Sequence, residues 1–300
     1  MDDLYPHRGF MLDTGRKFFP VKAIVNLLNL LHQYNFNVFH WHIYDAESFP
    51  LLWPADGELT KVSEKYNHSL EYYSPQDIGY IVKYAQNLGI RVYPETDMPG
   101  HCDIWGLWRK DLVVGTPDLK HPNAQLDITK AETHDYIRDL VSTVDRYFGS
   151  DSHHFGGDEV ALIWNTENDR KLLATFFEWL RTIPCCQHKK LILWDDPVTT
   201  ELGNGADDIS TDWVIQTWHN GVTKSVLEKG YRVVVSESET FYIGNADYER
   251  ITKFVFPVHR NVLGFEVVWF TSESDDPSNL EQSWIAEPLR AAAEIRRRPS

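Results

Sequence analysis

The stretch HHFGGDEV, His153 to Val160, ends a strand-like run with two glycines and two adjacent acids, Asp158 and Glu159. Neighbouring side chains in a regular strand point to opposite faces of the sheet. Glycine adopts backbone angles that other residues avoid, so both acids can face the same side once the strand has ended. The stretch therefore predicts a strand followed by a loop that carries paired carboxyl groups.

Strand-like and helix-like segments alternate along the whole chain. The predicted strands are Arg8–Asp13, Asn37–Asp45, Ile90–Asp97, His153–Glu159, Lys190–Asp196, Asp212–Trp218, Tyr231–Ser238 and Asn261–Phe270. The predicted helices are Val21–Tyr34, a segment from Ser74-Pro75 to Gly89, Lys130–Phe148, Asn168–Arg181 and Leu280–Arg297. Alternating β and α segments indicate a parallel sheet, and eight units favour a closed (β/α)8 TIM barrel of the α/β class.

We predict a single domain over residues 1–300, with its core at about 8–297. An open, doubly wound sheet is the alternative architecture. Its nucleotide-binding form carries a Gly-rich phosphate loop after the first strand. The sequence after Asp13 shows no such loop, which favours the barrel.

Composition excludes several classes of function. The net charge of −15 argues against a nucleic-acid or anionic-membrane surface, which needs clustered Lys and Arg. No apolar run of about 18 residues predicts a membrane span, and the opening MDDLYPHRGF does not resemble a secretory signal. Three cysteines, Cys102, Cys185 and Cys186, do not make a disulfide framework. The sequon beginning at Asn67 permits glycosylation in a secreted protein.

Polar and aromatic residues gather where the predicted strands end. They are Asp45, Asp97 with His101, Asp158 with Glu159, Trp194 with Asp195, Trp218, Tyr242 and Trp269. Active sites of (β/α)8 barrels lie at this carboxyl face. Paired carboxyl groups in a partly apolar cleft supply a proton donor beside an anion, which suits glycoside hydrolysis. The clustering therefore predicts an active site that acts on sugars.

Several of these motifs resemble one known family. HFGGDE resembles the His-x-Gly-Gly-Asp-Glu motif of glycoside hydrolase family 20, the β-N-acetylhexosaminidases. The resemblance extends, in the family's order, to RGFMLDTGRKFFP (Arg8–Pro20), FHWHIYDAESFP, YPETDMPGHC and LGFEVVWF. The small α+β domain that usually precedes the family's barrel is absent from this sequence, so the resemblance implies a catalytic domain alone.

The resemblance implies a retaining reaction in which the enzyme supplies no nucleophile. The sugar's 2-acetamido oxygen attacks the anomeric carbon and forms an oxazolinium intermediate. Glu159 would then be the general acid and later the base, and Asp158 would hold the acetamido N–H. Tyr242 resembles the tyrosine that donates to the acetamido oxygen. No cofactor and no metal are expected.

The resemblance also assigns residues that bind the sugar or support the acids. It implies tryptophan walls around the sugar at Trp194, Trp218 and Trp269. Arg8 matches an arginine that binds the O3 and O4 hydroxyls, although our strand prediction puts it at the amino end of its strand. Asp45 and His101 match the acid and the histidine that support the catalytic pair.

Two departures from the family pattern affect sugar recognition. The family usually has Tyr-x-Asp where this chain has Tyr242-Ile243-Gly244, and Trp-x-Glu where this chain has Trp269-Phe270-Thr271. The missing acids normally bind the O4 and O6 hydroxyls. The candidate substitutes are Glu273, through a bulge, and Asp247, through a loop. We therefore expect weaker or altered recognition there: tolerance of GalNAc as well as GlcNAc, room for a substituent at O6, or lower activity.

The resemblance implies a partner and a location as well. The partner would be an oligosaccharide or glycoconjugate with a terminal N-acetylhexosamine, and the protein would be secreted, lysosomal or vacuolar.

Two other functions stay open. His40 and His42 share a strand face, as in a metal-dependent barrel hydrolase, with His101, His153, His154 and Asp195 as further candidate ligands. The third possibility is a sugar-binding homologue with weakened catalysis.

Overall fold

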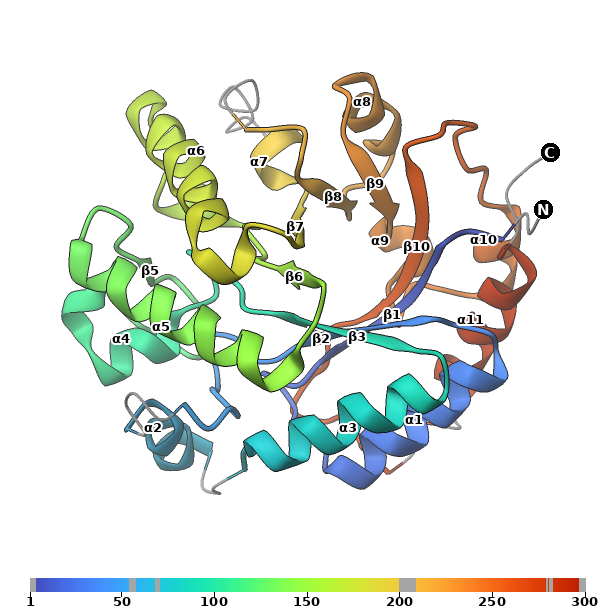
Figure 1. The fold of residues 1–300 in the computed structure, drawn as a ribbon, viewed down its shortest axis with the longest axis horizontal. Helices are drawn as coiled ribbons and strands as arrows, with labels where there is room; N and C mark the ends of the chain where they lie inside the picture. Colours follow the sequence, from blue (N-terminus) through green and yellow to red (C-terminus); the bar gives the residue numbers. More distant parts are fainter. Residues whose placement is uncertain are drawn as a thin grey trace.

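The computed structural model describes residues 4–53, 58–67, 71–199, 209–278, 280 and 283–296. Its barrel strands are β1 (His7–Asp13), β2 (Val38–His42), β3 (Arg91–Glu95), β6 (Ser152–His154), β7 (Lys190–Trp194), β8 (Val214–Thr217), β9 (Arg232–Val235) and β10 (Val262–Trp269). They close into a barrel in the order β1-β10-β9-β8-β7-β6-β3-β2, and every pair is parallel. The predicted (β/α)8 fold is confirmed, and Figure 1 shows the strands enclosed by helices.

The helices lie outside the barrel (Figure 1). They are α1 (Val21–Gln33), α2 (Glu58–Asn67), α3 (Pro75–Asn87), α4 (Asp103–Trp108), α5 (Ala131–Phe148), α6 (Glu167–Thr182), α7 (Asp196–Thr199), α8 (Thr223–Glu228), α9 (Ser238–Phe241), α10 (Tyr248–Lys253) and α11 (Ser283–Glu294). The four long predicted helices before residue 200 appear within two residues of their predicted bounds. The shorter α7 to α10 were not predicted.

Local sequence signals explain where the long helices begin and end. Ser74 caps α3 with a reciprocal capping box to Asp77, and proline at the first helical position needs no N–H partner. Thr166 caps α6 in the same way with Asp169. Gly149 ends α5 in the left-handed conformation that glycine adopts without strain. These signals fix the lengths of the connections and hence the places where the strands end.

The segment after β3 is built from elements that the sequence did not reveal. It contains α4, a 3-10 turn at Lys110–Leu112 and a two-stranded antiparallel sheet of β4 (Val113–Val114) and β5 (Gln125–Leu126). Asp103 stabilises this segment because its Oδ1 accepts three backbone N–H groups, from Asp118, Asn123 and Ala124. The segment covers one side of the barrel's carboxyl face.

The interior of the barrel is layered. An apolar layer lies toward the amino ends of the strands and consists of Val38, Tyr93, Ile192, Val214 and Val234. Above it lies a buried polar layer centred on Glu266, which accepts hydrogen bonds from His7, His40, Tyr93 and Gln216. Burial opposes ionisation of Glu266, but the two histidines hold its pKa below the usual value. The carboxyl face above this layer is left for the candidate site.

Three predictions from composition can be compared with the structure. The cysteines are free thiols. No helix among the described residues is long and apolar enough to cross a bilayer. The sequon at Asn67 extends into residues outside the described part of the chain.

Candidate active site

A pocket of about 180 Å³ opens at the carboxyl face of the barrel. Its lining comes from the ends of seven of the eight barrel strands and consists of Arg16, Asp45, Asp97, His101, Asp158, Glu159, Trp218, Tyr242 and Phe270. Seven of these nine residues were predicted from the sequence as site residues or as part of the polar cluster at the strand ends; Arg16 and Phe270 were not.

The two adjacent acids face this pocket because the backbone before them is left-handed. Gly156 and Gly157 have φ of +65° and +88°, and Glu159 itself has φ of +52°. A side chain at Gly156 would place its Cβ 1.8 Å from Asp97 Oδ1, so only glycine fits there. The Asp158 side chain is 12% exposed and that of Glu159 is 58% exposed. Asp158 therefore lies inside the pocket and Glu159 at its rim.

His101 joins the two acids to a buried partner. Its Nε2 lies 3.3 Å from Asp158 Oδ2 and 3.4 Å from Glu159 Oε2, and its Nδ1 lies 3.1 Å from Asp45 Oδ1. Burial lowers the pKa of His101, but the acids Asp45 and Asp158 outweigh it and raise the pKa well above its usual value. His101 is therefore an imidazolium that can donate to Asp45 and to the acid pair.

Asp45 and Asp97 differ in charge although both are fully buried. Burial raises the pKa of Asp45, but Arg16 and His101 outweigh it and hold the pKa well below the usual value. For Asp97, burial and the nearby Asp158 both raise the pKa well above that of a free acid. Asp45 is thus an anion, whereas Asp97 is a neutral acid beside Asp158.

Tyr242 enters the pocket from the segment after β9. The backbone N–H of Ile243 donates to the carbonyl of Val268, which fixes this segment against β10. Burial and the charge of Asp158 raise the pKa of Tyr242 well above its usual value. The phenol therefore stays protonated and can donate a hydrogen bond to a ligand.

Trp218 and Trp194 lie at different depths. Trp218 lines the pocket and its Nε1 donates to Asp196 Oδ2 at 2.5 Å. Trp194 is buried beneath it, and its Nε1 donates to Glu95 Oε1 at 2.8 Å. Trp194 packs in the apolar cluster that contains Trp218, Tyr242 and Phe270, so it forms the floor under the lining residues.

The structure contradicts the predicted wall at Trp269. Its ring lies outside the barrel and packs edge-on against Phe19 and Trp284. Side chains alternate along β10, and Glu266 points into the barrel, so Val268 and Phe270 point inward and Trp269 points outward. Phe270 therefore provides the wall that the sequence reading gave to its neighbour.

The structure also contradicts the placement of Arg8. Its Nε donates to the carbonyl of Asn35 and its Nη1 to that of Tyr5, at the amino end of the barrel. The arginine in the pocket is Arg16, which lies three residues past the end of β1. The direction of the strand could have identified Arg16 from the sequence, because Arg16 follows the carboxyl end of β1 and Arg8 lies near its amino end.

Arg16 is held by acids and an aromatic ring. It lies 2.9 Å from Asp45, 3.2 Å from Asp13 and 3.5 Å from Glu47, and its guanidinium lies 5.2 Å from the centre of the Phe270 ring. These contacts fix its position at the pocket while leaving it 21% exposed. The exposed part can donate to a ligand.

The two positions that lack the expected acids have different surroundings. Gly244 has φ of +103° and open space where a side chain would be. Thr271 is buried, and its hydroxyl donates to the carbonyl of Asp13. The proposed substitutes do not line the pocket: Asp247 caps α10 through the N–H of Arg250, and Glu273 is exposed.

Among the histidines suggested as metal ligands, His40 and His154 lie in the buried polar layer, whereas His101 lines the pocket. His40, Glu95 and His154 have ligand atoms close enough to share an ion. Burial lowers the pKa of His40, but Glu266 and Glu95 outweigh it and raise the pKa above its usual value. Its Nδ1 lies 2.9 Å from Glu266 and its Nε2 lies 2.9 Å from Glu95, so both ring nitrogens face carboxylates. Ion pairs account for its position.

Fold and pocket together define a (β/α)8 barrel with an acid–base site at its carboxyl face. The chain belongs to glycosyl hydrolase family 20: the model of that family's catalytic domain matches residues 5–256. The resemblance seen in the motifs is thereby confirmed.

Individual relatives and solved structures agree with this assignment. A β-hexosaminidase of Emericella nidulans is 32% identical over 271 residues, which cover 80% of this chain and 44% of the relative. A β-hexosaminidase subunit B2 of Dictyostelium discoideum is 31% identical and covers 92% of this chain and 54% of the relative. This chain thus spans about half the length of these relatives. A β-N-acetylhexosaminidase structure from Bacteroides fragilis has the same fold, with a TM-score of 0.83 at 21% identity, covering 100% of this chain and 68% of that one.

Proposed function

We propose that this chain is a retaining exo-β-N-acetylhexosaminidase that removes terminal β-linked GlcNAc or GalNAc with help from the sugar's 2-acetamido group. The observation that carries the proposal is the position of His101 Nε2, within 3.4 Å of both Asp158 and Glu159 at one pocket. Membership of family 20 and the names of the relatives, β-hexosaminidases, support the same activity.

Glu159 acts as the general acid and then as the base. Its exposed position at the rim suits a group that must reach the glycosidic oxygen and later a water molecule. The enzyme needs no carboxylate nucleophile, because family 20 is among the glycosidases that use the substrate's own group.

Asp158 and Tyr242 orient the acetamido group from two sides. The carboxylate accepts the amide N–H and stabilises positive charge that develops on the oxazolinium. The phenol donates to the amide oxygen and directs it toward the anomeric carbon. Fixing these atoms in a near-attack arrangement lowers the entropic part of the barrier. His101 holds Asp158 in place through its Nε2 and is itself held by Asp45 through its Nδ1.

Arg16, rather than Arg8, binds sugar hydroxyls, and Trp218 with Phe270 encloses the ring. Gly244 leaves open space, and the Thr271 hydroxyl is already bonded to the carbonyl of Asp13, so hydroxyl recognition lacks two carboxylates at these positions. One charge-assisted hydrogen bond contributes roughly 1.5–3 kcal/mol. We therefore propose that the protein accepts both epimers at C4 and tolerates a substituent at O6.

The test is release of nitrophenol from nitrophenyl β-glycosides of GlcNAc, GalNAc and glucose. Activity is expected on the first two only, since glucose lacks the acetamido group. Glu159→Gln and Asp158→Asn should each lose on the order of 10²–10⁴-fold in kcat. Proton NMR should detect the β-anomer of the sugar as the first product. Equal cleavage of the glucoside, or the α-anomer first, would contradict the proposal.

A weakened sugar-binding homologue is the second candidate, favoured by the surroundings of Gly244 and Thr271. It predicts binding of N-acetylglucosamine without nitrophenol release. A metal-dependent hydrolase predicts instead that a chelator abolishes activity. The same assay separates the three functions.

A further inference from the structure

Asp196 lies next to the pocket and contacts two of its lining residues without lining the pocket itself. Its Oδ1 accepts the backbone N–H of Glu159 at 3.0 Å, and its Oδ2 accepts the indole N–H of Trp218 at 2.5 Å. It is 5% exposed and begins the short helix α7 after β7. One buried carboxyl group thus connects the proton donor to the wall of the sugar pocket.

Glu159 needs such an anchor because its backbone is held in the left-handed region, at φ of +52°. Residues other than glycine adopt this region at a cost and only when their surroundings require it. The main chain of Glu159 is fixed on both sides: Asp196 accepts its N–H, and Gln125 Nε2 donates to its carbonyl at 3.2 Å. The side chain of Glu159 is largely exposed, so these backbone contacts carry much of its positioning.

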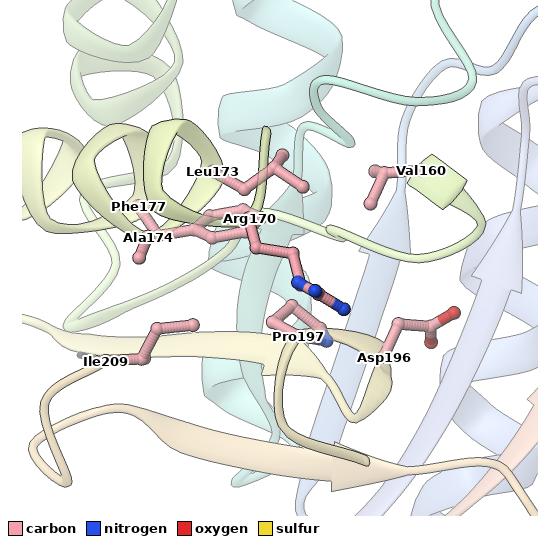
Figure 2. A pocket seen from close by; sticks show the side chains of 8 residues that line it. All are labelled: Val160, Arg170, Leu173, Ala174, Phe177, Asp196, Pro197 and Ile209. Carbon is pink, nitrogen blue, oxygen red and sulfur yellow. The ribbon is translucent and has the colours of Figure 1, made fainter. Parts of the chain in front are cut away.

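Packing behind the Glu159 loop is incomplete. Figure 2 shows a cavity between α6 and the residues around Asp196, with Val160 on its other side and the Asp196 carboxyl group pointing away from α6. The cavity holds about 10 Å³, at the lower limit for one water molecule. Because Val160 borders this gap, apolar packing alone does not hold the loop that carries the catalytic acid.

We propose that Asp196 is a positioning residue, which holds the backbone of Glu159 and the indole of Trp218 in register for proton transfer to the leaving group. The inference rests on the proposed function of Glu159 as general acid. Asparagine at this position keeps one acceptor oxygen but turns an NH₂ group toward the second donor. Either the backbone N–H of Glu159 or the indole N–H of Trp218 then loses its acceptor.

The charge of Asp196 depends on its neighbours. Burial, Asp158 and Asp195 raise its pKa to about 7. Arg170 of α6 lines the same cavity as Asp196 (Figure 2). His219, which lies against Asp195, and the two N–H donors also face this region. At pH 8 the group is a carboxylate that accepts both hydrogen bonds. Experiments on its role therefore belong at this pH, because a protonated Asp196 resembles the asparagine variant.

The experiment compares two substrates that differ in their need for a proton. Dinitrophenolate leaves from its GlcNAc glycoside without protonation, whereas the sugar alcohol released from N,N′-diacetylchitobiose requires the general acid. At pH 8, Asp196→Asn should lose on the order of 10–100-fold in kcat/KM on chitobiose, as expected for a misplaced acid. On the dinitrophenyl glycoside it should keep its activity within about threefold. Retained activity on this substrate also shows that the variant is folded.

Asp195→Asn is the matched control, because the Asp195 carboxyl group accepts from His219 and from the backbone of Trp218 but has no hydrogen bond to Glu159 or to the Trp218 indole among the described residues. It should show no selective loss on chitobiose. Equal losses of Asp196→Asn on both substrates, or no loss on either, would overturn the positioning role. If the wild-type protein cleaves neither glycoside, the proposed function is wrong. If the wild type is active but Asp196→Asn shows no selective loss, only the positioning role is wrong.

Discussion

The substitution Arg16→Lys tests whether sugar binding depends on the planar guanidinium of Arg16 or only on its positive charge. Arg16 pairs with Asp45, Asp13 and Glu47, and it lies over the ring of Phe270. Lysine keeps a positive charge beside these acids, so the variant should fold. It loses the planar fork of donors that allows arginine to bind an acid and a sugar hydroxyl at the same time.

The expected effect follows from one lost charge-assisted hydrogen bond to the sugar. Such a bond contributes roughly 1.5–3 kcal/mol, which corresponds to about a 10–150-fold decrease in kcat/KM. Steady-state kinetics on the nitrophenyl β-glycoside of GlcNAc measures it. Because the acids around Arg16 stay paired, thermal unfolding should change little.

Arg8→Lys is the matched control at the other end of the barrel. Arg8 donates to two backbone carbonyls there, so its replacement should cost about 1 kcal/mol of stability for each lost hydrogen bond. Its kcat/KM should stay within about threefold of wild type, a change of less than 1 kcal/mol. The reasoning is refuted if Arg8→Lys loses as much activity as Arg16→Lys, or if Arg16→Lys retains full kcat/KM.

Three further substitutions probe stability and recognition. Burial, Asp158 and Asp195 raise the pKa of Asp196 to about 7 from its usual 3.8, so ionising it in the folded state costs about 4 kcal/mol. A raised acid pKa favours folding at low pH, and that stability is lost as the pH rises to 7. Relative to Asp196→Asn, wild type should therefore lose about 4 kcal/mol of unfolding free energy between about pH 4 and pH 8 in urea titrations; a constant difference would contradict this. Gly156→Ala should cost about 2–5 kcal/mol in the same assay, through a steric clash and left-handed strain, and a neutral effect would be inconsistent with the structure. Gly244→Asp should lower KM for GlcNAc glycosides by at most about tenfold, because strain at φ of +103° costs about 1–3 kcal/mol; an unchanged KM would count against the pocket assignment.

Much of the architecture was predictable because it depends on local signals. Apolar runs and caps such as Ser74 gave the strands and the long helices, and the polar residues at strand ends gave the acid pair. Strand direction and alternation were also readable, although the family pattern suggested otherwise. They place Arg16 rather than Arg8 at the carboxyl face and turn Phe270 inward in place of Trp269.

The remaining features depend on closure of the barrel. Asp196 reaches the backbone of Glu159 across 37 residues of sequence, and Asp97 meets Gly157 across 60. Neither contact leaves a local pattern, because each requires strands that become neighbours only in the folded sheet. The neutral state of Asp97 likewise follows from burial beside Asp158, which composition does not reveal.

Participation of the sugar's amide is the central claim, and a series of nitrophenyl glycosides with zero to three fluorines on the acetyl methyl group tests it most directly. Fluorine withdraws electrons from the amide oxygen and weakens it as a nucleophile, while Asp158 and Glu159 are unchanged. The account predicts that kcat/KM falls steeply with each added fluorine. A rate that is independent of fluorine number would contradict it, because an attacking group on the protein would then be responsible.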